Sequence, residues 1–381
     1  MVLSWKPGGP QERLITWLCD IVRSMISASS YLIRFCSALR TLLSRFMSGT
    51  WLVVRLIYLL GPSLRAYVML VRLLCFAMLI SIKFLPVLCT WLSPAVRTFS
   101  YGPHLRNSVD VYFPRSTVPD RKVPLVFGVT GGAWIIGYKL WLGCMGRKLA
   151  QDSKCLFVSI DYRNFPDAVV SEMISDIAAA VRWGLCRAEA WGYDITNVTL
   201  LGQSAGAHLV ALLLMQPVGW VLDFCEISRI KRFIGISGPY DLEALVDSCI
   251  NRGLPEKMFR SLVGGPLSAF SPIHLLGKSD FNPCSFPPTV LLHGTADLTV
   301  PVFVSESFSH ALNFRGVQCR SYIFDGVSHT DLILEMLLEE DFIVLQIIYD
   351  SVFNSSTYIH KRKKAVYSAG WLSLARFVNP F

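Results

Sequence analysis

A serine between two glycines is the first feature of this sequence that points to chemistry. Residues 202–206 read Gly-Gln-Ser-Ala-Gly, which places Ser204 between Gly202 and Gly206. A serine hydroxyl is best presented on a sharp turn between a strand and a helix, and flanking glycines remove the Cβ atoms that would collide there. The next residue, Ala205, would offer its backbone N–H to an oxyanion. Because so short a pattern can arise by chance in a chain with 26 glycines, its meaning depends on its surroundings.

A carboxylate and a histidine follow Ser204 in suitable positions. A serine needs an imidazole to take its proton and an acid to orient that imidazole. Asp297 comes in a turn after the apolar run 290–292, and His329 follows the strand-like run 320–324 and a glycine turn. Open α/β sheets place their active sites at the carboxyl ends of strands. We therefore predict that Asp297 is the orienting acid and His329 the base.

Other acids and histidines are less well placed. Asp325 is the rival of Asp297 for the role of the acid. His208 lies on the predicted helix after the serine, and we expect it to point away from the leaving group. His293 belongs to the turn that leads to Asp297, so we expect it to brace that loop.

An apolar strand over residues 123–129 ends in Thr130, Gly131 and Gly132. Two adjacent glycines let backbone N–H groups come close to a developing negative charge. By itself this segment would fit a plain turn at a strand end. Together with the serine motif it predicts that Gly131, Gly132 and Ala205 form an oxyanion hole.

Strands alternate with helical stretches from about residue 108 onward. The strands are expected over residues 109–113, 123–129, 156–160, 197–201, 232–237, 290–292 and 320–324, and helices over 170–186 and 207–215. This alternation predicts an α/β protein with a mostly parallel sheet covered by helices on both faces. A serine on a strand–turn–helix, followed along the chain by the acid and then the histidine, is typical of the α/β-hydrolase fold.

Three separated segments resemble the isoprenylcysteine α-carbonyl methylesterases. They are residues 130–139, 160–166 and 201–208, which read TGGAWIIGYK, IDYRNFP and LGQSAGAH. Thr130 replaces the histidine with which many related esterases begin the first of these segments, as it does in the methylesterases. The resemblance covers about residues 100–350.

This resemblance implies an α/β-hydrolase that hydrolyses the methyl ester of a C-terminal prenylated cysteine at the membrane of the endoplasmic reticulum or Golgi apparatus. It implies Ser204 as nucleophile, Asp297 as acid and His329 as base, with Gly131, Gly132 and Ala205 around the oxyanion. The chemistry requires no cofactor and no metal.

The segment 220–276, which would cap the substrate cleft, does not match the family pattern clearly. Alternative functions therefore stay open. One is a general membrane carboxylesterase or lipase, or an arylformamidase on the same scaffold. Another is a hydrolase-derived receptor that binds a small ligand without turnover, although such proteins typically lose the serine or histidine that this chain keeps.

The first 100 residues differ in composition from the rest. They hold 11 Lys or Arg and two acids, an excess of nine that equals the formal net charge of +9 for the whole chain. Between residues 66 and 88 the sequence is nearly all apolar, with Arg72 and Lys83 as interruptions. We expect a helical arm attached to a lipid membrane, either spanning it or lying in the headgroup layer. The arm is too apolar for a nucleic-acid surface.

The expected domain organisation has three parts. Residues 1–100 form the arm, 101–353 the catalytic domain and 354–381 a basic tail, with a hinge at 101–106. The 11 cysteines include no C-x-x-C pair, which indicates buried thiols in a reducing compartment rather than disulfides or a zinc site.

Overall fold

The structure is a computed structural model of the chain. It describes residues 64, 67–68, 71–72, 75, 95–114, 123–152, 155–216, 221–251, 255–333 and 343–353. The chain divides into two units, Met1–Tyr58 and Leu59–Phe381, and every element described below belongs to the second. The predicted tail and nearly all of the predicted arm lie outside the described residues. Within the described ranges, no helix combines the length and the apolar character needed to cross a membrane.

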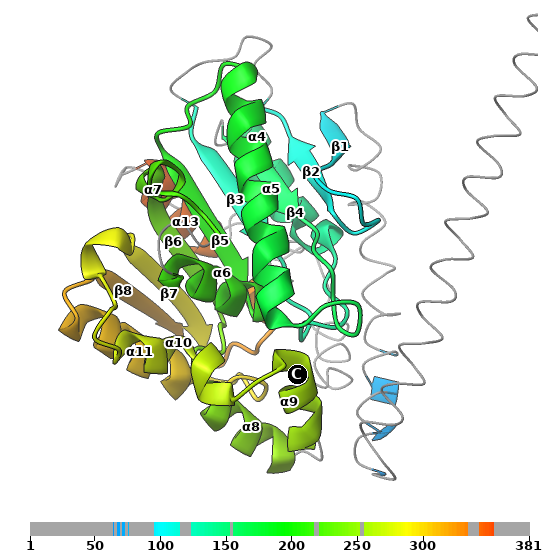
Figure 1. Ribbon diagram of the computed structural model, residues 1–381, viewed down its shortest axis with the longest axis vertical. Helices are drawn as coiled ribbons and strands as arrows, with labels where there is room; N and C mark the ends of the chain where they lie inside the picture. The colour runs from blue at the N-terminus through cyan, green and yellow to red at the C-terminus, as the bar shows by residue number, and fades with distance from the viewer. Residues whose placement is uncertain are drawn as a thin grey trace, which may run out of the picture. The chain divides into compact units, whose positions relative to one another are not determined.

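The described residues form one eight-stranded sheet in the order β1-β2-β4-β3-β5-β6-β7-β8 (Figure 1). The strands are β1 Val96–Ser100, β2 Ser108–Tyr112, β3 Leu125–Val129, β4 Leu156–Ile160, β5 Val198–Gln203, β6 Ile230–Ile236, β7 Thr289–Gly294 and β8 Cys319–Phe324. Strand β2 is antiparallel to β1 and β4, whereas all the other neighbours are parallel. The central strands are continuous apolar runs because helices bury both of their faces. The predicted α/β-hydrolase sheet is confirmed.

Helices pack on both faces of this sheet. The main ones are α4 Gly143–Asp152, α5 Val170–Ala190, α6 Ala205–Met215, α11 Val302–Phe314 and α13 Ile343–Phe353. Val126 of β3 packs in one cluster with residues of α4 and α13. The next residue, Phe127, points to the other face, where its ring leaves no room for a Cβ on Gly184 of α5. In Figure 1, α5 crosses in front of the strands.

Short helices follow β5 and β6. They are α7 Phe224–Ser228 before β6, and then α8 Leu242–Asn251, α9 Glu256–Val263, 3-10 helix η2 Leu267–Phe270, α10 Pro272–Leu276 and 3-10 helix η3 Pro283–Ser285 before β7. A further 3-10 helix, η1 Lys139–Leu142, leads into α4. The segment between β6 and β7 contacts the helix that follows the serine, because the carbonyl of Phe270 accepts a hydrogen bond of 2.7 Å from His208.

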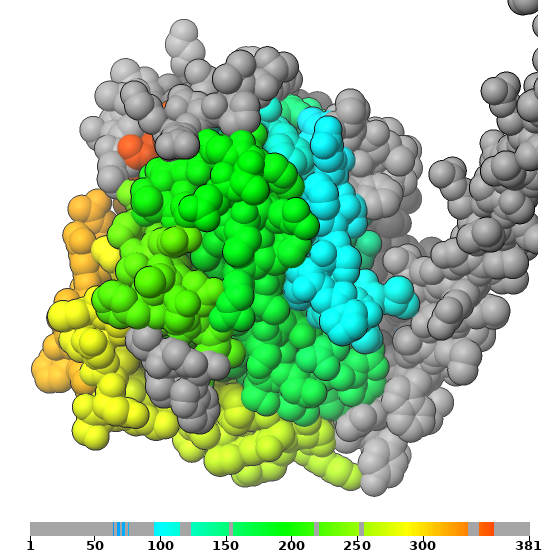
Figure 2. Space-filling view, turned by 45° about the horizontal axis from the view of Figure 1, so that its top comes forward, coloured from blue at the N-terminus to red at the C-terminus, as the bar shows by residue number. Residues whose placement is uncertain are grey.

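The sheet begins inside the range predicted to be the arm. Strand β1 pairs with β2 from Val96 to Ser100, so the predicted boundary at residue 100 falls after this strand. Its side chains meet α5, since Phe99 packs against Trp183 and Trp191. In the space-filling view the cyan surface of strands β1 and β2 lies directly beside the green surface of α5 (Figure 2).

The interpretation of residues 101–106 as a hinge is wrong. This segment joins β1 and β2, and the N–H of Tyr101 donates to the carbonyl of Asn107 at 2.9 Å. The Tyr101 hydroxyl donates to the carbonyl of Asp161, just past β4, at 2.6 Å. Because residues 101–106 join two paired strands and also bond to a third segment, their position is fixed. The sequence suggests a hinge here because strand β1, which anchors the segment, has exposed positions and does not read as a buried strand.

The described cysteines are free thiols, in part buried and in part exposed. Cys155 and Cys249 are buried as expected, but Cys186 and Cys225 are exposed. Cys186 lies on the outer face of α5 and Cys225 in the short helix α7. The prediction of buried thiols is therefore wrong for these two residues, and also for Cys75 and Cys284, which are exposed as well.

Candidate active site

The predicted serine turn is present between β5 and α6. Ser204 has φ 52° and ψ −123°, a strained conformation that lifts the side chain away from the strand. Its N–H donates to the carbonyl of Ile236, at the end of β6, at 2.7 Å. A Cβ at Gly206 would lie 2.2 Å from the carbonyl oxygen of Val129, and one at Gly202 would lie 2.5 Å from the Cα of residue 207. Glycine is required at both places because the backbone of other segments occupies the space.

The structure brings the three predicted triad residues into one hydrogen-bonded chain. The His329 Nε2 lies 2.8 Å from the Ser204 Oγ. The other ring nitrogen of His329, Nδ1, lies 2.6 Å from Oδ2 of Asp297. All three residues are buried. They follow strands β5, β7 and β8. Ser204 and His329 are 125 positions apart in the sequence, and the sheet brings them together. This arrangement can move a proton from the serine to an oriented imidazole.

The acid is held by its own loop. Asp297 Oδ1 accepts the N–H groups of Thr299 and Val300, both at 2.8 Å. His293 Nε2 lies 2.9 Å from Asp297 Oδ2, and its Nδ1 lies 2.6 Å from the hydroxyl of Ser305. The expectation that His293 braces this loop is confirmed.

These contacts also set the charge of Asp297. Burial by itself would raise the pKa of its carboxyl, but the imidazoles of His329 and His293 outweigh burial and hold the pKa well below its ordinary value. Asp297 is therefore ionised at neutral pH, as an acid that orients an imidazole must be.

The two rival residues are placed elsewhere. Asp325 is exposed and accepts a hydrogen bond from the hydroxyl of Thr295 at 2.9 Å. His208 is fully buried on α6, where its Nε2 bonds to the carbonyl of Phe270. Burial lowers the pKa of His208 to about 4, although this bond opposes the shift. His208 is thus a neutral, enclosed side chain.

The predicted oxyanion residues surround the serine, with one complication. Ala205 opens helix α6, where the N–H groups of the first turn have no carbonyl partner within the helix. A Cβ at Gly131 would lie 2.7 Å from the Cβ of Ser204, so this glycine lies against the nucleophile. However, the N–H of Gly131 donates to the side-chain Oε1 of Gln203 at 3.2 Å. A substrate oxygen would have to compete with Gln203 for that donor.

The remainder of this turn has unusual backbone geometry. Gly132 has φ +116°, and a Cβ on it would lie 2.4 Å from the N of Gly137. Ala133 and Trp134 follow with φ of 51° and 61°, in the left-handed region that non-glycine residues rarely adopt. The Trp134 ring stands edge-on to that of His208, with centroids 5.2 Å apart. Sequence reasoning missed Gln203, since the second position of the serine motif carries no specific signal.

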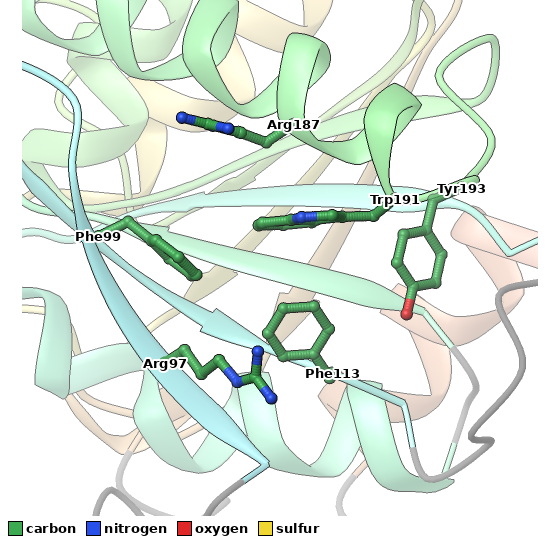
Figure 3. A pocket seen from close by; sticks show the side chains of 6 residues that line it. All are labelled: Arg97, Phe99, Phe113, Arg187, Trp191 and Tyr193. Carbon is green, nitrogen blue, oxygen red and sulfur yellow. The ribbon is translucent and has the colours of Figure 1, made fainter.

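A pocket of about 400 Å³ lies in a different part of the domain (Figure 3). It is lined by Arg97, Phe99, Phe113, Arg187, Trp191 and Tyr193. The register of the sheet places Val96 opposite Tyr112 and Tyr112 opposite Phe157, near the amino end of β4. The triad follows the carboxyl ends of the parallel strands. The pocket is therefore separate from the triad.

Comparisons with known proteins show which proteins this chain resembles. The chain matches the BD-FAE family over residues 109–312. It is 35% identical over 317 residues to a rice protein (Oryza sativa subsp. japonica) named probable isoprenylcysteine alpha-carbonyl methylesterase ICME, covering 78% of this chain and 75% of that protein. It is also 35% identical over 301 residues to the isoprenylcysteine alpha-carbonyl methylesterase ICME of Arabidopsis thaliana, covering 75% of this chain and 69% of that protein.

Among solved structures, esterase 2 of Thermogutta terrifontis has a similar fold. Its TM-score is 0.55 at 22% identity, with 70% of this chain and 97% of that chain covered. At this level of identity the likeness supports the fold alone. Taken together with the family match and the plant relatives, it shows that the chain is an esterase of the α/β-hydrolase fold that belongs to the BD-FAE family and to the isoprenylcysteine alpha-carbonyl methylesterases.

Proposed function

We propose that the protein hydrolyses the carboxyl methyl ester of isoprenylated C-terminal cysteine, with Ser204, Asp297 and His329 as its catalytic residues. The single observation that carries the proposal is the unbroken hydrogen-bonded chain from Asp297 through His329 to Ser204. The names of the plant relatives support the choice of substrate.

The first half of the reaction acylates the serine. His329 Nε2 takes the proton of Ser204 while the oxygen attacks the ester carbonyl, and Asp297 stabilises the imidazolium that forms. The carbonyl electrons move onto oxygen, where the N–H groups of Ala205, Gly131 and Gly132 stabilise the charge. When the carbonyl re-forms, the C–O bond to the methoxy group breaks. Methanol leaves with the proton from His329.

The second half reverses these roles with water as the nucleophile. His329 removes a proton from water, the new oxyanion forms in the same place, and the bond to Ser204 Oγ breaks as that oxygen recovers its proton. The products are the free carboxylic acid and the original serine. Every proton is carried by His329, so the scheme needs no cofactor and no metal.

The proposal extends to a membrane, because a prenyl chain partitions into lipid. We propose that the part of the predicted arm that precedes strand β1 attaches the enzyme to the membrane of the endoplasmic reticulum or Golgi apparatus. The support is compositional: the basic excess of this region coincides with a long apolar run. Full-length protein should float with anionic vesicles. A variant with glutamine at five arginines of the arm should float less if the arm lies at the surface; these five are Arg34, Arg45, Arg55, Arg65 and Arg72.

The substrate proposal is tested with the full chain and matched esters. N-acetyl-S-farnesylcysteine methyl ester is compared with its S-methyl analogue, with p-nitrophenyl acetate and with an N-formyl arylamine, and methanol or product release is measured. We expect kcat/KM for the farnesyl ester to exceed that for the S-methyl analogue by at least about tenfold, because the prenyl chain buries apolar surface on binding. Equal rates on the two methyl esters, or a preference for the acetate or the formamide, would replace the proposal with a general carboxylesterase or an arylformamidase.

The role of the serine is tested in the same assay. Ser204→Ala should lower kcat by roughly a millionfold, leaving only the small residual catalysis that the oxyanion donors and substrate binding supply. Its melting temperature and vesicle binding should match the parent protein. A Ser204→Ala variant that kept measurable turnover of the farnesyl ester would remove this residue from the mechanism.

A further inference from the structure

Arg106 lies in the connection between β1 and β2, before the region that matches the BD-FAE family. Its side chain is about three-quarters buried and donates to three different acceptors. Nε donates to the carbonyl of Tyr162 at 2.8 Å, and Nη2 donates to the carboxylate of Asp161 at 2.7 Å. Nη2 also donates to the carbonyl of Gly137. One guanidinium thus joins two segments that are separate in sequence, Gly137 and the adjacent residues Asp161 and Tyr162.

Gly137 ends the segment 130–137, which we name the oxyanion turn. A Cβ added to Gly137 would lie 2.4 Å from the carbonyl oxygen of Gly131, and one added to Gly132 would lie 2.4 Å from the N of Gly137. The two ends of the turn are therefore in direct backbone contact. The carbonyl of Gly137 also accepts the side-chain N–H of Asn164 at 2.9 Å. A shift of Gly137 would be transmitted directly to the glycines that face the serine.

Tyr162 ties the beginning of the oxyanion turn to the same guanidinium. Its hydroxyl donates to the carbonyl of Thr130 at 3.0 Å, while its own carbonyl accepts the Nε–H of Arg106. Arg106 therefore reaches the end of the turn directly and its start through Tyr162. Tyr162 is fully enclosed, so this path has little freedom to move.

We propose that Arg106 is a positioning residue for the oxyanion hole: its guanidinium fixes the oxyanion turn at both ends and so sets how well Gly131 and Gly132 meet the charge on the substrate. This rests on the proposed role of these glycines. The guanidinium does not touch the substrate. A small displacement of an oxyanion donor reduces its contribution, because the hydrogen bond must meet the oxygen of the transition state and not that of the ground state.

The test compares Arg106→Gln with a matched control, Arg182→Gln. Like Arg106, Arg182 binds a carboxylate and a backbone carbonyl: two of its nitrogens bond to Glu226 at 2.6 and 3.0 Å, and Nη2 donates to the carbonyl of Val221 at 2.8 Å. It lies far from the turn in sequence and joins α5 to the segment around α7. Both variants and the parent are assayed as full chains on p-nitrophenyl acetate and on its thiono analogue, in which sulfur replaces the carbonyl oxygen.

Sulfur is larger than oxygen and a weaker hydrogen-bond acceptor, so oxyanion donors stabilise the thiono transition state less. The ratio of kcat for the oxygen ester to kcat for the sulfur ester therefore reports on the donors themselves. We expect Arg106→Gln to lower kcat on the oxygen ester by roughly ten- to a hundredfold with KM nearly unchanged, and to lower the ratio by about tenfold. Arg182→Gln should change neither quantity by more than about twofold.

A general loss of structure would reduce the rates on both esters alike and leave the ratio unchanged, and that result would overturn the proposal. If Arg106→Gln does not fold, Arg106→Lys gives the same comparison, since lysine keeps the charge beside Asp161 with a single nitrogen for three acceptors. No turnover of either ester by the parent protein would instead overturn the serine esterase mechanism, and this inference with it. Turnover by the parent with an unchanged ratio in the variant would overturn this inference alone.

Discussion

The acid loop and the oxyanion turn serve the same serine, but they are stabilised in opposite ways. Apart from its contact with His329, the carboxylate of Asp297 is held by His293, Thr299 and Val300, all within four positions of it along the chain. The oxyanion turn is held by residues that are remote in sequence. Arg106 reaches Gly137 across 31 positions, Tyr162 reaches Thr130 across 32, and Gln203 reaches Gly131 across 72.

This difference has a physical consequence. A loop held by neighbours forms its contacts as soon as the local turn forms, with little loop-closure entropy. A turn held by distant segments acquires its shape when the sheet has assembled and those segments meet. We therefore expect changes in the acid loop to act mainly on the charge and orientation of His329. Changes around the turn should act on geometry and should depend on remote residues.

The largest expected effect is on the acid itself. Asp297→Asn should lower kcat by about 10⁴-fold, because the amide no longer stabilises the imidazolium or selects the correct tautomer of His329. Steady-state kinetics on a short ester measures this loss. Asp325→Asn is the matched control and should keep kcat within about twofold, since Asp325 is exposed and bonds to Thr295. An equal loss in both variants would mean that the acid has been assigned wrongly.

The next-largest effect tests whether the oxyanion turn has space for an added methyl group. Gly131→Ala would place a methyl group 2.4 Å from Gln203 Oε1 and 2.7 Å from the Cβ of Ser204. We expect kcat to fall by roughly a hundredfold, comparable to the loss of one oxyanion donor. Gly265→Ala is the control, because its methyl group would meet only the ring of Phe270 at 3.3 Å. Full activity of Gly131→Ala would show that the turn can move without cost, contrary to the comparison drawn above.

A stability effect is expected at His208, whose ring stands against Trp134 of the oxyanion turn. Burial lowers the pKa of this imidazole to about 4, from 6.5 in the unfolded chain. Because the unfolded state binds the proton first, the free energy of unfolding is highest above pH 6.5. It should fall as the pH drops towards 4, by about 3 kcal/mol in total for this group.

Denaturant unfolding at several pH values measures this contribution. In His208→Gln the free energy of unfolding should change less steeply with pH than in the parent protein, because glutamine does not titrate. Other groups still titrate, so the test is the change in slope and not the absolute free energy of unfolding. His310→Gln, on α11, serves as the control for replacing a histidine. Parallel curves for His208→Gln and the parent between pH 4 and 6.5 would contradict the neutral, buried state of His208.

The smallest effect concerns the outer support of the acid loop. Ser305→Ala removes the hydroxyl 2.6 Å from His293 Nδ1 and leaves a buried ring nitrogen without that partner. We expect a loss of about 1 kcal/mol in the free energy of unfolding and a decrease in kcat of less than about fivefold. Thermal unfolding and kinetics measure the two. Ser175→Ala, at an exposed position of α5, should leave both unchanged. A larger loss of activity than of stability would assign His293 a more direct part in the chemistry.

The sequence alone was enough to predict the triad and most of the sheet. Ser204, Asp297 and His329 each follow a strand at a turn rich in glycine or polar residues; the strands before Ser204 and Asp297 are apolar, whereas β8 before His329 is mostly exposed. Strand β4 begins and ends where it was expected. These features are local, since a buried strand needs continuous apolar residues and a strained serine turn needs glycines beside it. The expected role of His293 could be inferred for the same reason, because its partner is four positions away.

Only the tertiary structure decided how the oxyanion turn is supported. Strand β1 has exposed and partly exposed positions, so its sequence does not resemble a buried strand, and its place in the sheet follows from pairing with β2. Arg106 and Gln203 carry no signal of their own, because arginine and glutamine are common on any surface. Their roles come from contacts across 31 and 72 positions, which exist only when the sheet brings those segments together.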